Sequence, residues 1–226
     1  MLKQITLSLT LLCLPACAQE TTPAMPDGFA QATDYVPGLV QEIRYFGDNN
    51  FVGRPIDGYE APECILSIEA AQALASAQDA LSEFGLGLKV FDCYRPQRAV
   101  TNFAEWARDP NDTARMADYY PNVPKDELFE RGYIAERSGH SRGSAVDLTI
   151  IDLATSEEID MGSGYDLFDP LSWPSDLRPT ADQRANRMLL QRVMVDAGFN
   201  LLDEEWWHFW LTEEPYPDTY FDFLVE

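Results

Sequence analysis

The chain is short of positive charge. Its 226 residues carry 16 lysines and arginines against 38 aspartates and glutamates, a formal net charge of −22. Nucleic-acid binding needs a cationic surface, so this balance argues against a DNA- or RNA-binding role. Long apolar runs are lacking beyond the first twenty residues, which excludes a protein that crosses a membrane several times. A hydrophobic content of 46% is sufficient for one globular domain.

The first seventeen residues have the pattern of an export signal. Lys3 gives the positive start, residues 5–14 form a short apolar stretch, and the following LPAC sequence resembles a bacterial lipobox ending at Cys17. The overlapping ACA sequence fits the cleavage site of ordinary secretion, so Cys17 is either lipidated or removed. Both alternatives place the mature protein outside the cytoplasm, in the periplasm or cell envelope, and only a lipid on Cys17 would attach it to a membrane.

Composition divides the rest of the chain into two parts. Residues 18–35 are rich in Thr, Pro, Ala and Gln, which predicts a flexible tether. The folded domain is then expected to span residues 36–226. Of the four cysteines, Cys64 and Cys93 lie in this domain and form a candidate disulfide in an oxidising compartment. Two separate buried thiols are the alternative.

Hydrophobic spacing predicts a mixture of helices and strands. Ser67 and the pair Thr180 and Gln183 have the residue types of helix N-caps, and apolar residues recur every three or four positions after each. Helices are predicted over residues 67–84, 100–107 and 180–197, and strands over 86–90, 146–150 and 206–211. Because these elements do not follow a strict β-α-β order, we predict a single α+β domain with an antiparallel or mixed central sheet flanked by helices.

Histidine is scarce, and both histidines lie in polar motifs. His140 lies in SGHSRGSAVD and His208 in EWWH. A hydrolytic zinc site needs three N or O ligands and an open position for water, and two histidines with Asp147 would provide the ligands. Asp147 alternates with apolar neighbours in its predicted strand, and a turn over residues 141–144 would bring His140 towards it. Glu205 could then approach a metal-bound water.

Each of these residues also has an ordinary structural explanation. A lone histidine is commonly a structural or surface residue, and Asp147 could be a charge at the edge of a strand. The tryptophans beside His208 fit a hydrophobic core as well as a substrate platform. Spacing alone therefore leaves the metal site as one of several alternatives.

Taken together, the motifs resemble the zinc-dependent D-alanyl-D-alanine dipeptidases, the group of zinc D,D-peptidases that includes the vancomycin-resistance enzyme. The similarity covers roughly residues 35–212 and lies in five blocks, at residues 41–53, 94–96, 138–147, 161–166 and 205–208. The histidine motif is shared with D,D-carboxypeptidases and related amidases, whereas the blocks at 94–96 and 161–166 favour the dipeptidases among these enzymes. Gly139 departs from the family, which often has a basic residue there, and the lipobox departs from its cytoplasmic members.

The resemblance implies hydrolysis of D-Ala-D-Ala in the bacterial cell envelope, as part of peptidoglycan metabolism, with one Zn²⁺ per chain. It implies that His140, Asp147 and His208 are the zinc ligands and that Glu205 carries the proton. Arg95 would donate to the oxyanion, and Asp166 and Ser138 would contact the substrate near its ammonium group. Outside this family Arg95 would fit a surface ion pair, and Asp166 would fit a cap of a helix or turn.

Two other functions remain open at this point. A D,D-carboxypeptidase or peptidoglycan amidase would use the same metal site. A zinc-binding envelope protein without catalysis would need the metal ligands alone, and Glu205 argues against it because a pure binder needs no base.

Overall fold

Five strands form a central sheet in the order β2-β4-β5-β7-β6. β2 runs parallel to β4 and all other neighbours are antiparallel, so the sheet is mixed. A small second sheet pairs β1 with β3. The strands are β1 (Phe29–Gln31), β2 (Val40–Gln41), β3 (Ile65–Ser67), β4 (Leu86–Asp92), β5 (Ala145–Asp152), β6 (Phe199–Leu202) and β7 (Glu205–Leu211).

The computed structural model describes residues 24–226. The predicted export signal, with Cys17, lies outside the described residues. Within them, no helix is both long enough and apolar enough to span a membrane.

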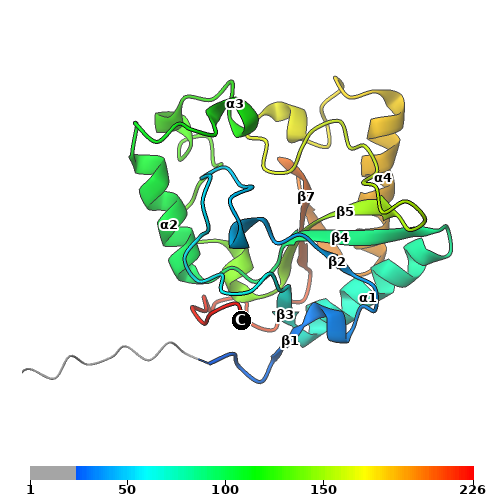
Figure 1. Ribbon diagram of the computed structural model, residues 1–226. Coiled ribbons are helices and arrows are strands. Elements are labelled where there is room, and N and C mark those ends of the chain that lie inside the picture. Colours follow the sequence, from blue (N-terminus) through cyan, green and yellow to red (C-terminus); the bar gives the residue numbers. More distant parts are fainter. Residues whose placement is uncertain (1–23) are drawn as a thin grey trace, which may run out of the picture.

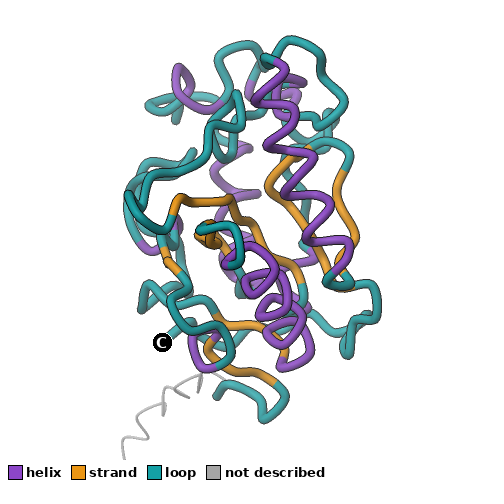
Figure 2. The backbone as a smooth tube through the Cα atoms, turned by 90° about the vertical axis from the view of Figure 1, so that its right-hand side faces the viewer, coloured by secondary structure: helices purple, strands orange, loops and turns teal. Residues whose placement is uncertain are grey.

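Helices flank the central sheet, as predicted for an α+β domain. α1 (Ile68–Ser82) and α4 (Ala181–Asp196) pack against each other and against strands, whereas α2 (Gln97–Arg108) lies across the molecule from them, followed by the short α3 (Met116–Tyr119) (Figure 1). In Figure 2, α1 and α4 lie in front of the strands. The predicted fold class is therefore confirmed.

The helix starts follow the capping residues seen in the sequence. The Ser67 hydroxyl accepts the backbone N–H of Ala70 at the start of α1, and Thr180 forms a capping box with Gln183 at the start of α4. The C-terminal end of the first helix was predicted too far along the chain. α1 ends at Ser82, so Phe84 lies outside the helix and is 76% exposed.

The folded domain begins before the predicted boundary at residue 36. Phe29–Gln31 forms β1, paired with β3, and Ala32 is fully buried. The Phe29 ring packs edge-on against the rings of Tyr94 and Phe223. The prediction of a flexible tether is therefore wrong for residues 29–35. A three-residue strand is too short to show a hydrophobic period, which is why composition alone suggested a tether.

The structure joins Cys64 and Cys93 in a disulfide, with Cα atoms 5.2 Å apart. Cys64 directly precedes β3 and Cys93 directly follows β4, so the bond ties the small sheet to the central one. Both cysteines are buried.

Candidate active site

Three neighbouring strands each place one polar residue in a row across the central sheet. Asp92 of β4 is opposite Asp147 of β5, which is opposite His208 of β7. Residues directly opposite on adjacent strands have their side chains on the same face. A β-bulge between Val90 and Asp92 shifts the β4 register, so Asp92 rather than Phe91 lies opposite Asp147.

His140 joins this row from a short 3-10 turn, Gly139–Arg142. The Ser138 hydroxyl caps the turn by accepting the backbone N–H of His140. Gly143 ends the turn with φ +80°, and a Cβ atom there would lie 2.1 Å from the Phe29 ring. Glycine is therefore required at this position both for its backbone conformation and for space. The turn predicted between His140 and the following strand is present.

The donor atoms of His140, Asp147 and His208 all lie within 4.8 Å of one another. His208 Nδ1 is 2.9 Å from Asp147 Oδ1 and 3.1 Å from His140 Nε2. His140 Nδ1 lies 2.7 Å from the carbonyl oxygen of Cys93, to which it donates, so its Nε2 lone pair is free to bind a metal. Two imidazoles and one carboxylate fit a tetrahedral zinc site with an open fourth position.

A cavity of about 200 Å³ opens over this cluster. It brings together all seven residues that the sequence motifs singled out: Arg95, Ser138, His140, Asp147, Asp166, Glu205 and His208. Their placement agrees with one site, while their chemical roles stay predictions. Trp206 and Trp207 are buried core residues, so for them the structural alternative holds.

Glu205 is the first residue of β7, three positions before His208. Its burial raises its pKa to about 7; the His208 charge lowers the pKa and the Asp147 charge raises it further. A carboxyl group whose pKa lies near neutrality can both take and return a proton. Glu205 therefore has the acid–base property that a proton carrier needs.

Arg95 forms a buried ion pair rather than a surface one. Its Nε donates to Asp92 at 2.9 Å, and its guanidinium lies 5.0 Å from the centre of the Tyr45 ring. Asp92 is fully buried and also accepts the Tyr59 hydroxyl at 2.6 Å. Asp92 was not singled out from the sequence, although it directly precedes the segment that contains Arg95. Its carboxylate fixes the guanidinium at the edge of the cavity.

Asp166 lies in the loop after β5 and has φ +59°, a left-handed conformation that Asp tolerates better than most residues. It is only 6% exposed, and the hydroxyl of Tyr45 lies 2.8 Å from its Oδ2. Burial, followed by the negative charge of Asp147, raises the pKa of Asp166 well above its usual range. Tyr45 was another unassigned residue, although it lies in one of the motif blocks.

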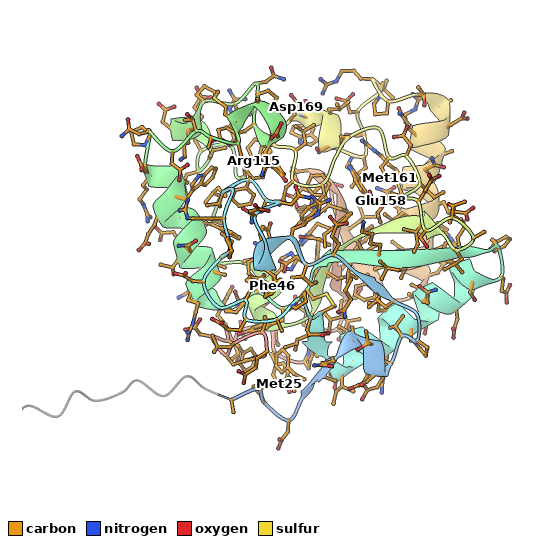
Figure 3. All side chains as sticks on the ribbon, in the orientation of Figure 1. Met25, Phe46, Arg115, Glu158, Met161 and Asp169 are labelled. Carbon is orange, nitrogen blue, oxygen red and sulfur yellow. A yellow bond between two sulfur atoms is a disulfide. The ribbon has the colours of Figure 1, made fainter. Side chains whose placement is uncertain are left out.

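Arg187 of α4 contacts the loop that carries Asp166 and the segment that follows it. Its side chain is buried, and its guanidinium donates to the backbone carbonyls of Met161 at 2.6 Å and of Trp173 and Leu171 at 3.0 Å. Figure 3 shows Met161 beside α4. Nothing in the sequence separates Arg187 from the other arginines of this helix, because its role depends on the tertiary contact.

Known proteins resemble the chain over nearly the whole described region. A family model described as D-ala-D-ala dipeptidase matches residues 25–226. The chain is 44% identical over 201 residues to the D-alanyl-D-alanine dipeptidase of Streptomyces coelicolor and 39% identical over 202 residues to that of Enterococcus faecium. Each alignment covers 89% of this chain and 100% of the relative. The D-alanyl-D-alanine dipeptidase of Escherichia coli is 34% identical over 78% of this chain and 81% of its own length. This chain therefore belongs to the D-Ala-D-Ala dipeptidase family.

Proposed function

We propose that this protein hydrolyses the dipeptide D-Ala-D-Ala to two D-alanines, with one zinc ion bound by His140, Asp147 and His208. The observation that carries this proposal is a single cavity that contains both the donor cluster and the buried carboxyl group of Asp166. A peptidase for free dipeptides needs a metal centre at the scissile bond and an acid near the substrate's amino terminus. The names of the relatives support the same substrate.

Zinc, when bound, supplies a Lewis acid and lowers the pKa of a water ligand to about 7. Glu205 takes the proton of the attacking water and then returns it to the leaving amine. One carboxylate serves both transfers because they follow each other. The pKa of about 7 that burial gives Glu205 supports this double role.

Arg95 and Asp166 act at the two ends of the dipeptide's amino-terminal residue. Arg95, fixed by Asp92, donates hydrogen bonds to the oxyanion that forms at the scissile carbonyl. Asp166 pairs with the substrate ammonium, and the Ser138 hydroxyl adds a hydrogen bond near the same group. Because Ser138 also caps the His140 turn, its hydroxyl is held at the cavity wall.

The test compares D-Ala-D-Ala with its N-acetyl derivative. The acetyl group removes the positive charge that Asp166 would pair with, and loss of one partner of a buried, hydrogen-bonded charge pair costs roughly 2–5 kcal/mol. We therefore expect kcat/KM to be about 10²-fold or more higher for the free dipeptide. Asparagine tolerates the same backbone conformation as Asp166, so Asp166→Asn should keep the fold. It should raise KM for the free dipeptide and lower the ratio of kcat/KM between the free and the N-acetylated dipeptide. A wild-type ratio near one would instead indicate a D,D-carboxypeptidase.

We also propose that the protein is exported and attached to the cell envelope by a lipid on Cys17. The lipobox-like sequence supports the anchor, and a disulfide between Cys64 and Cys93 fits an oxidising compartment. Mass spectrometry of the protein purified from its host should find diacylglycerol on an N-terminal Cys17. A mature chain that begins after Cys17 would replace the anchor with ordinary secretion.

A further inference from the structure

Hydroxyl groups link the metal cluster to the carboxyl group assigned to the substrate ammonium. The Tyr165 hydroxyl lies 3.0 Å from Oδ2 of Asp147 and 3.1 Å from the hydroxyl of Tyr45, which in turn lies 2.8 Å from Oδ2 of Asp166. All four residues are buried, with exposed fractions between 1% and 6%. The reaction steps described above use neither tyrosine hydroxyl.

The printed contacts give each tyrosine hydroxyl a defined role. The Tyr45 hydroxyl donates to Oδ2 of Asp166, whereas the Tyr165 hydroxyl has two acceptors within hydrogen-bond distance, Oδ2 of Asp147 and the hydroxyl oxygen of Tyr45. Because a tyrosine hydroxyl carries one proton, Tyr165 shares that proton between a metal ligand and the residue that contacts Asp166.

The shared proton couples the two ends of the cavity. A shift of the Tyr45 hydroxyl at the Asp166 end moves the acceptor that competes with Asp147 for the Tyr165 proton.

We propose that Tyr165 is a positioning residue that joins the two ends of the site. Its hydroxyl orients the metal ligand Asp147 and, through Tyr45, supports Asp166 for recognition of the substrate's amino group. The inference rests on the proposed function for its substrate half, whereas its metal half needs only the cluster. Removing such a hydrogen bond to a metal ligand typically costs about 10- to 100-fold in metal affinity or activity.

Tyr165→Phe tests this role because it removes the hydroxyl and keeps the ring. The ring stacks on Phe91 at 4.7 Å and meets Trp207 edge-on at 5.4 Å, and both contacts remain in the variant. Tyr94→Phe is a matched control, since the buried Tyr94 hydroxyl donates to the carbonyl oxygen of Phe223 at 3.0 Å. Tyr94 is not among the cavity-lining residues. Zinc affinity is measured by chelator competition, and kcat and KM are measured for D-Ala-D-Ala and its N-acetyl derivative, in the mature protein.

Tyr165→Phe should weaken zinc binding about 10-fold or more and lower the preference for the free dipeptide by about 5-fold, mainly through KM. Tyr94→Phe should lower the melting temperature about as much as Tyr165→Phe does, while its zinc affinity and its preference for the free dipeptide stay within about twofold of wild type. If either zinc affinity or substrate preference of Tyr165→Phe stays within about twofold of wild type, the link is overturned. A wild type that does not cleave D-Ala-D-Ala would overturn the proposed function instead, and zinc affinity would still test the contact with Asp147.

Discussion

The proposed site has two ends, a metal end with His140, Asp147 and His208 and an ammonium end with Asp166, and the two are held in place by different means. At the metal end, Asp147 and His208 come from paired central strands, so the backbone ladder of the sheet sets their separation. At the ammonium end, Asp166 lies in a segment without regular structure, residues 160–169, which we call the ammonium loop. The buried side chain of Arg187 holds this loop by donating to the carbonyl of Met161 and the hydroxyl of Ser163. A sheet positions a residue by register, whereas a loop depends on distant side chains.

The largest effect is expected at the metal end. His208→Ala leaves two ligands, which cannot hold a catalytic zinc ion tightly, so the variant should lose stoichiometric zinc and essentially all activity. Wild type should contain one zinc per chain, lose activity with a chelator and regain it with added zinc. Elemental analysis of the two purified proteins measures the number of zinc ions per chain. A full equivalent of zinc in His208→Ala would remove this residue from the ligand set.

Glu205 separates metal binding from proton transfer. Glu205→Ala should fold and bind zinc normally, because Glu205 is proposed to be a proton carrier and not a ligand. Its turnover should fall by about 10²–10⁴-fold. The control is the zinc content of the same preparation. A zinc-loaded variant with nearly wild-type kcat would show that another group carries the proton.

Arg187 tests the ammonium loop without touching the cavity cluster. Arg187→Ala removes the hydrogen bonds to the Met161 carbonyl and the Ser163 hydroxyl of the loop and two more to carbonyls just beyond it. We therefore expect about 2–3 kcal/mol lower stability and a KM about 10-fold higher, with zinc content unchanged. Arg192→Ala on the same helix is the control, since Arg192 is exposed and pairs only with Asp196 among the described residues. Equal KM values for the two variants would mean that the loop holds its shape without Arg187.

The smallest effect on turnover is expected from the disulfide. Replacing both Cys64 and Cys93 by Ser should leave kcat within about twofold, because their side chains do not reach the cavity, but should lower stability by about 3–4 kcal/mol in the chain-entropy model. Thermal unfolding of oxidised and double-variant proteins measures this difference. Two free thiols in protein isolated from the cell envelope would contradict the bond itself.

The metal end was also the more predictable of the two from sequence. His140, Asp147 and His208 lie in short motifs, and strand alternation indicated which way Asp147 faces. The β-bulge that places Asp92 opposite Asp147 could not be foreseen, because register depends on the partner strand. The site's histidines and acids could be named from the sequence, but their surroundings could not.

The ammonium end shows more clearly which contacts cannot be predicted from the sequence. The sequence block around Asp166 was recognised, but the support from Tyr45 and Arg187 was not, since both residues are far from Asp166 along the chain. Helix starts were predicted correctly from the capping residues Ser67 and Thr180, because capping is a local interaction. The N-terminal boundary failed at β1, where three residues gain their structure only by pairing with β3.

The turn that carries His140 has a consequence for how the metal could leave. Its backbone is bonded to three distant parts of the chain: Ser67 donates to the carbonyl of Gly143, Arg95 to that of His140, and Phe221 to that of Ser141. A segment tied in this way opens only together with the elements it contacts, so the amide hydrogens of Ser67 and Phe221 that donate to it should exchange slowly with solvent. Opening of the turn is therefore a minor route for loss of a bound ion, and a chelator has to reach the metal through the cavity.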